Sequence, residues 1–273
     1  MKKYKLSFVQ GRLSPQIGSN FQYFPIDNWE NELKVANKIG LKNIEWIISD
    51  LSNPLFNKTF FKIIKRKLYS LKLSISSISL DFLTREPLYL SNTQDLNWLI
   101  IKLNNISKHF NYIRINVPIE ENSSIYNITQ LNKVKKNLIF LKNKLSKNFI
   151  LSLETDLTPN NVRLLLNNKQ FRGIGLNIDI GNIEANGYDI EEYFSKLRKF
   201  IFGIHIKNRD SLFSSSKMLK NKKNLNFICK NLYKLENLND ITLQTYKDNK
   251  KYKNQFISNL KLIKHKLNYY DRS

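Results

Sequence analysis

Residues 175–189 read GLNIDIGNIEANGYD. The stretch begins as an alternation of apolar residues, Leu176, Ile178 and Ile180, which is typical of a buried strand. Asp179 interrupts the alternation, and a helical pattern follows from residue 189. A carboxylate near the end of a buried strand is expected where the carboxyl ends of parallel strands form a binding site. We therefore ask how the neighbouring strands end.

The same order of strand and helix recurs along the chain. Short apolar runs predict strands at 5–13, 42–48, 73–81, 111–118, 148–156, 173–181, 201–208 and 240–246. Helical patterns follow at 28–40, 58–72, 95–110, 129–145, 158–168, 189–200, 225–237 and 254–267. Strict alternation implies a parallel sheet with right-handed crossovers, and eight units in 273 residues fit a (β/α)₈ barrel. We predict an α/β fold with a single TIM-barrel domain over 1–273. The alternative is a doubly wound sheet, but no G-x-G-x-x-G turn follows the first strand.

The chain is strongly basic, with 45 Lys and Arg against 22 Asp and Glu and a formal net charge of +23. A charge of this size is typical of proteins that bind polyanions such as nucleic acid. The lysines are spread over the helical segments instead of forming one block. This spread favours compositional drift, and we expect no specific nucleic-acid partner.

Composition also bears on compartment. Hydrophobic residues make up 41% of the chain, which is enough for a sizeable core. The single cysteine, Cys229, allows no disulfide within the chain and fits a reducing cytosol. The first apolar stretch is broken by Ser7, Gln10 and Arg12, unlike a signal peptide, and no run approaches the roughly 20 apolar residues of a membrane span. We expect a cytoplasmic protein without a membrane partner, and leave open whether it forms a homo-oligomer.

Polar residues stand near the ends of the predicted strands, which meet on one face of a TIM barrel. They are Gln10, Arg12, Glu45, Asp81, Arg114, Asn116, Glu154, Asp156, Asp179, His205, Lys207 and Gln244. Glu154, Asp179, His205 and Gln244 come from four successive strands and offer two carboxylates, an imidazole and an amide oxygen. This set suits one divalent ion such as Mn²⁺, Mg²⁺, Co²⁺ or Zn²⁺. The alternative is a ring of polar groups that only cap or hydrogen-bond at the rim.

Several short motifs then carry a resemblance. They are FVQGRLSP (8–15), IEWI (44–47), LETD (153–156), IDIGN (178–182) and GIHIKNRD (203–210). In this order they resemble the xylose isomerase-like TIM-barrel superfamily, and most closely its sugar phosphate isomerase/epimerase members. The resemblance implies one divalent metal ion held by Glu154, Asp179, His205 and Gln244. It also implies proton transfer through an enediolate of a small-molecule sugar or sugar phosphate, with Glu154 as the base.

Other residues near the predicted mouth are expected to serve the substrate. Lys207 alternates into the mouth with His205, and could polarise a substrate oxygen or hold an anionic group. We expect substrate contacts from Gln10, Arg12, Glu45, Asp81, Asn182 and Arg209. Since Glu45 and Trp46 alternate, only one of them can face the barrel interior, and we expect Glu45 there.

Two departures from the resemblance affect the chemistry. Gln244 stands where these proteins carry a glutamate, and an amide cannot act as a base. Asn182 stands where epimerases of this kind often carry a substrate-binding histidine. These changes favour one-base isomerisation, lyase-type chemistry or lost activity over two-base epimerisation. The alternative function is a non-catalytic sugar-binding or regulatory barrel.

A second branch of the superfamily, the AP endonucleases, is excluded because this chain has too few histidines for the metal site of that branch. A resemblance to that branch would imply a three-zinc site built with many histidines. This chain has three histidines, His109, His205 and His265, and two of them fall near the ends of predicted helices. Three zinc ions would lack ligands.

Overall fold

Eight parallel strands form a closed barrel in sequential order, and β8 pairs with β1 to close it. The strands are β1 (Lys5–Val9), β2 (Asn43–Ile47), β3 (Ser74–Ser79), β4 (Ile113–Ile119), β5 (Phe149–Thr155), β6 (Gly175–Asp179), β7 (Ile201–Ile206) and β8 (Asp240–Leu243). The structure is a computed structural model that describes residues 4–16, 22–207, 222–245 and 251–271. The predicted α/β TIM barrel is confirmed.

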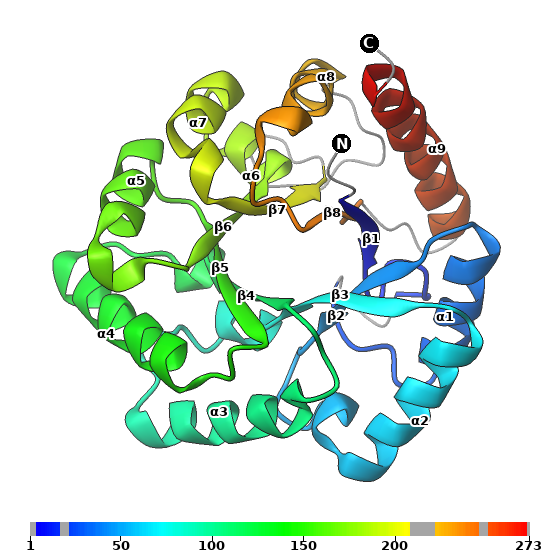
Figure 1. The fold of residues 1–273 in the computed structure, drawn as a ribbon, viewed down its shortest axis with the longest axis horizontal. Coiled ribbons are helices and arrows are strands. Elements are labelled where there is room, and N and C mark those ends of the chain that lie inside the picture. Colours follow the sequence, from blue (N-terminus) through cyan, green and yellow to red (C-terminus); the bar gives the residue numbers. More distant parts are fainter. Residues whose placement is uncertain (1–3, 17–21, 208–221, 246–250, 272–273) are drawn as a thin grey trace.

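The α-helices surround the barrel on its outside (Figure 1). They are α1 (Trp29–Lys38), α2 (Lys58–Ser70), α3 (Thr93–Ser107), α4 (Ile128–Lys144), α5 (Pro159–Asn167), α6 (Ile180–Ala185), α7 (Ile190–Leu197), α8 (Lys222–Asn231) and α9 (Tyr252–Asp271). Side-chain caps start several of them, such as Asn57 before α2 and Thr158 before α5. None of the helices within the described ranges has the length and apolar character needed to cross a membrane.

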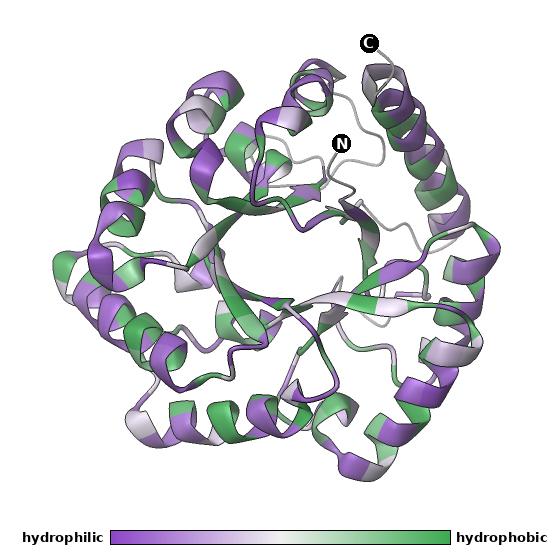
Figure 2. Ribbon diagram, viewed as in Figure 1, coloured by the Kyte–Doolittle hydropathy of each residue, from purple (hydrophilic) through white to green (hydrophobic). Residues whose placement is uncertain are grey.

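The hydrophobic core lies between the barrel and its helices. Ile44 and Trp46 of β2 are fully buried in this layer, where the Trp46 ring packs 5.3 Å from the ring of Phe24. Glu45, between them, has the opposite direction and points into the barrel. Figure 2 shows hydrophobic and hydrophilic residues alternating along the helices, as expected for helices that cover a core on one side. Burial of this layer therefore fixes which strand residues face the interior.

The barrel interior is polar beneath the mouth. The guanidinium of Arg114 on β4 lies 2.6 Å from Asp240 Oδ1 and 3.0 Å from Glu45 Oε2, measured from Nη2. Gly203 on β7 makes room for it, because a Cβ at that position would lie 2.6 Å from Arg114 Cζ. The buried positive charge is thus balanced by two buried carboxylates.

The strand ends differ from the prediction: seven strands end one to four residues earlier than predicted, with β1 ending at Val9 and not at 13, and β4 ends later. The predicted strand 173–181 ends at Asp179, and residues 180–185 form the short helix α6. Asp179 is the reason, since its Oδ1 accepts a hydrogen bond from the backbone N–H of Asn182 at 3.0 Å and so caps that helix. Strand β4 runs to Ile119, one residue beyond the predicted end at 118.

Candidate metal centre and active site

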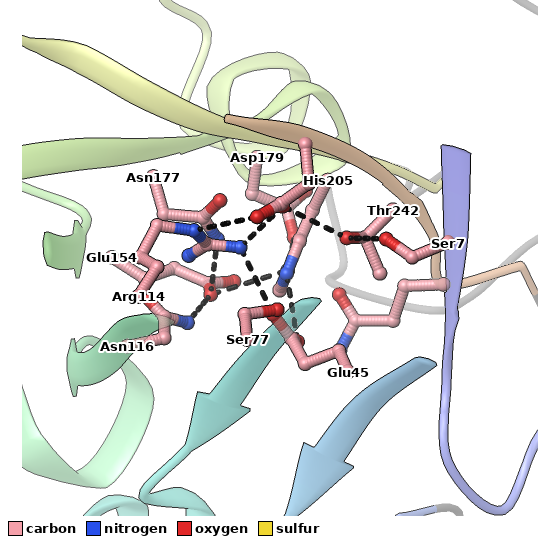
Figure 3. A network of polar contacts seen from close by, with 12 residues as sticks. Ser7, Glu45, Ser77, Arg114, Asn116, Glu154, Asn177, Asp179, His205 and Thr242 are labelled. Carbon is pink, nitrogen blue, oxygen red and sulfur yellow. Dashed lines mark hydrogen bonds and ion pairs between the residues drawn. The ribbon is translucent and has the colours of Figure 1, made fainter. Parts of the chain in front are cut away.

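Three of the predicted ligands meet at the carboxyl ends of β5, β6 and β7. Glu154, Asp179 and His205 offer ligand atoms that all lie within 4.8 Å of one another, and all three side chains are buried. His205 Nδ1 lies 3.2 Å from Glu154 Oε2 and 3.9 Å from Asp179 Oδ2. Figure 3 shows the three side chains converging from separate strands. They form one compact cluster of two carboxylates and an imidazole.

A second set of contacts holds this cluster from below. His205 Nε2 faces Glu45 Oε1 at 2.9 Å, and Glu45 Oε2 accepts hydrogen bonds from Ser77 Oγ at 2.7 Å and Arg114 Nη2 at 3.0 Å. Carboxylates that face the second nitrogen of a metal-binding histidine commonly fix the orientation of its ring. Glu45 is completely buried among protein groups, so it lies beneath the mouth, in position to orient His205.

Glu154 is held by two amides that the sequence did not single out for this role. The Nδ2 groups of Asn116 on β4 and Asn177 on β6 donate to Glu154 Oε2 at 2.6 and 3.0 Å. Both amides follow the inward-facing alternation of their strands, which is the signal that could have indicated them. Both bonds use Oε2, and Glu154 Oε1 lies 4.0 Å from Lys207 Nζ.

The charges of the cluster compensate one another. Burial opposes ionisation of Glu154, but His205, Lys207 and Asn116 outweigh it and hold the pKa of Glu154 well below its usual range. Burial likewise opposes a charged imidazole, but Glu154 and Glu45 outweigh it and hold the pKa of His205 well above its usual value. Glu154 is therefore a carboxylate at neutral pH.

Lys207 is also at the cluster. Its Nζ lies 2.5 Å from Asp179 Oδ2 and 4.0 Å from Glu154 Oε1, and its side chain is buried. Lys207 lies two positions after His205, just beyond the end of β7, so both side chains point into the barrel. The ammonium group thus stands between the two carboxylates of the cluster.

The donor set fits a divalent cation. Ligand atoms held about 2.1 Å from one ion lie roughly 3–4 Å apart, and the distances from His205 Nδ1 to the two carboxylates fall in that range. His205 Nδ1 is buried and makes no aligned hydrogen bond within the described part of the chain. Carboxylate oxygens with one imidazole suit Mg²⁺, Mn²⁺, Co²⁺ or Zn²⁺.

Gln244 follows β8 at the same end of the barrel and takes part in a chain of amide contacts. Its Nε2 donates to Gln22 Oε1 at 2.8 Å, and Gln22 Nε2 donates to Asp81 Oδ1 at 2.6 Å. Arg12 Nη2 donates to the same Gln22 oxygen at 2.8 Å. Gln22, which the sequence did not indicate, therefore links Arg12, Asp81 and Gln244 on one side of the mouth.

The remaining predicted residues lie in different places. Gln10 is fully buried and accepts the Ile47 N–H at 3.2 Å, so it stands within the β1–β2 seam. Asn182 lies at the start of α6 beside Asp179, and its Nδ2 donates to Glu120 Oε2. Arg209 lies outside the described residues. Glu120, at the end of β4, was missed because the predicted strand stopped two residues earlier.

Comparison with solved structures confirms the predicted resemblance at the level of the fold. A xylose isomerase-like TIM barrel protein from Mycobacterium smegmatis, in complex with magnesium, is 15% identical, with a TM-score of 0.69 over 98% of this chain and 97% of that one. A structure of L-ribulose 3-epimerase is 12% identical, with a TM-score of 0.72 over 99% and 96%. A sugar phosphate isomerase/epimerase from Parabacteroides distasonis is 16% identical, with a TM-score of 0.64 over 96% and 94%.

At these identities the similarity concerns the fold alone. No family model matches the sequence. No curated protein matches it either. The chain therefore shares its barrel fold with solved structures described as a xylose isomerase-like TIM barrel protein, an L-ribulose 3-epimerase and a sugar phosphate isomerase/epimerase.

Proposed function

We propose that this chain is a divalent-metal-dependent isomerase of a sugar or sugar phosphate, with Glu154 as the base. The observation that carries the proposal is the convergence of Glu154, Asp179 and His205, with the imidazole Nδ1 turned toward both carboxylates. The neighbours named as sugar epimerases and as a magnesium complex support the same class of chemistry.

The residues divide the work by position. A divalent ion held by Glu154, Asp179 and His205 would supply positive charge beside the substrate oxygens. Glu154, ionised at neutral pH, takes the proton from the carbon next to the substrate carbonyl and returns it to the adjacent carbon. Lys207 contributes a second positive charge where the enediolate oxygen develops.

Loss of a carbon-bound proton to solvent tests the proposal directly. D-fructose, L-ribulose and D-fructose 6-phosphate are incubated with protein and Mn²⁺ in D₂O, and exchange next to the carbonyl is followed by ¹H NMR. We expect exchange with wild type on at least one probe and a loss of about 100-fold or more with Glu154→Gln. Glu236→Gln, which changes an exposed glutamate just before β8, is the matched control.

Two outcomes would contradict the proposal. Equal exchange in wild type and Glu154→Gln would remove Glu154 as the base. No exchange with wild type on any probe would favour the alternative, a non-catalytic sugar-binding barrel.

A further inference from the structure

Glu120 is a buried carboxyl group at the mouth with no role in the proton transfer proposed for Glu154. Strand β4 directs Arg114 and Asn116 into the barrel, and the same alternation continues through Pro118 to Glu120. Pro118 is the register partner of Glu154 on β5. Glu120 therefore stands about 6–7 Å further along the strand direction, one layer closer to the mouth than Glu154.

Asn182 holds Glu120 and links it to the ligand cluster. The Asn182 side-chain amide donates to Glu120 Oε2, while the Asn182 backbone N–H donates to Asp179 Oδ1 at 3.0 Å. Asn182 is 4% exposed, and its Oδ1 has no hydrogen-bond partner in the described ranges. A buried acceptor without a donor points to a ligand with a hydroxyl group, since buried polar atoms are ordinarily paired.

The surroundings of Glu120 differ from those of Glu154. The titratable groups that face it are Glu121 on its own segment, Glu154 on β5, Asp179 on β6, Lys207 after β7 and Tyr193 on α7. Burial and the negative charges of Glu154 and Asp179 outweigh Lys207 and raise the pKa of Glu120 well above its usual range. Two carboxyl groups in different electrostatic surroundings thus share one mouth, an arrangement typical of an acid paired with a base.

We propose that Glu120, held by Asn182, moves the oxygen-bound proton of the substrate while Glu154 moves the carbon-bound proton. The inference rests on the proposed isomerase function. In the first step Glu154 takes the proton from the α-carbon, and the Glu120 carboxylic acid gives its proton to the carbonyl oxygen on which the enediolate charge develops, forming an enediol. In the second step Glu120 takes the proton of the neighbouring hydroxyl, and Glu154 returns its proton to the adjacent carbon. Both side chains end as they began.

This pairing also selects the reaction. Gln244 cannot accept a proton, so the chain has no base at that position for a two-base epimerisation. One carbon proton moved on one face, with one oxygen proton moved by a separate acid, is aldose–ketose isomerisation. The substrate class is therefore an α-hydroxy aldehyde or its ketose isomer, whose hydroxyl meets Asn182 Oδ1.

The test compares product formation with proton exchange in Glu120→Gln. With L-ribulose, D-fructose and D-fructose 6-phosphate as probes, isomer formation should fall by about 10²–10⁴-fold. Exchange of the α-proton with D₂O needs only Glu154, so the ratio of exchange to product should rise by about tenfold or more. Glu236→Gln, which changes an exposed glutamate just before β8, should leave both rates unchanged. Asn182→Ala should shift the ratio in the same direction and serves if Glu120→Gln does not fold.

Other outcomes overturn the inference separately from the function. Wild-type product formation in Glu120→Gln would remove Glu120 from the reaction and leave Glu154 chemistry intact. Equal losses of product and exchange, together with a lower melting temperature, would mean that Glu120 is only structural. Wild type that neither exchanges nor converts any probe would overturn the proposed function and this inference with it.

Discussion

Gln244 is a predicted metal ligand with a neutral amide side chain, whereas Glu154 and Asp179 offer charged carboxylates. Its Oε1 is buried and makes no hydrogen bond within the described residues, while its Nε2 is held by Gln22. A carboxylate at this position would add a negative charge to a site that has two. We predict that Gln244→Glu binds Mn²⁺ more tightly by on the order of 1–3 kcal/mol, roughly tenfold or more in affinity.

Isothermal titration of Mn²⁺ into both proteins measures this difference. Gln94→Glu, on the exposed face of α3, places the same charge elsewhere and should not change the affinity. Equal affinities for wild type and Gln244→Glu would mean that residue 244 does not contact the metal.

Asp81 gives a pH-dependent prediction. Burial raises the pKa of Asp81 to about 6, against the opposing effects of Gln22, Arg85 and Arg12. The stability contributed by its neutral form is complete below the unfolded pKa of about 4 and is lost as the pH rises through about 6. We predict that Asp81→Asn, which keeps the acceptor for Gln22, stabilises the metal-free protein by about 2–3 kcal/mol at pH 8.

Urea unfolding at two pH values checks the sign. The gain from Asp81→Asn should shrink toward zero as the pH is lowered to about 4, because both forms are then neutral. The exposed Asp27→Asn is the control. The same gain at both pH values, or a loss at pH 8, would show that burial of the Asp81 charge does not destabilise the protein.

At the scale of the elements, Gly203 determines whether β7 and Arg114 can share the barrel interior. An alanine Cβ would lie 2.4 Å from Asn177 Oδ1 and 2.6 Å from Arg114 Cζ. Asp240 and Glu45 hold Arg114, and Asn177 holds Glu154, so neither can move freely. We predict that Gly203→Ala lowers the free energy of unfolding by about 1–3 kcal/mol.

Chemical denaturation of this variant should be compared with that of Ser74→Ala, an exposed position on β3. A Gly203→Ala protein as stable as wild type would mean that the interior network repacks without cost.

The strand pattern was sufficient to predict the barrel, because each strand buries one face against the helices and ends in polar residues. It could also predict that Glu154, Asp179 and His205 lie together, since parallel strands bring their carboxyl ends together. The pairing of Arg114 with Asp240 could not be predicted, because the two residues are 126 positions apart and polar interior groups have no fixed partner in a sequence pattern. Glu120 was missed for a local reason: Pro118 looks like the end of a strand, yet β4 continues through it to Ile119.

For the whole molecule, the net charge of +23 raises the question whether the protein binds nucleic acid. Exposed lysines stand on helices at separate positions around the barrel, such as Lys62 on α2, Lys133 on α4 and Lys261 on α9 (Figure 1). Because this charge is dispersed, we predict weak binding to duplex DNA at 150 mM salt, roughly physiological ionic strength, and no incision at an abasic site. Gel-based incision assays check this, and cleavage that His205→Ala abolishes would contradict it.

The central claim is that Glu154, Asp179 and His205 hold one divalent ion at the barrel mouth. Equilibrium dialysis against Mn²⁺, followed by elemental analysis, measures the bound metal per chain. We predict one Mn²⁺ in wild type and in His265→Ala, which changes an exposed histidine of α9. Asp179→Asn and His205→Ala should fall to background at the same free metal concentration. Wild type without bound Mn²⁺, or His205→Ala with the full wild-type amount, would contradict the account.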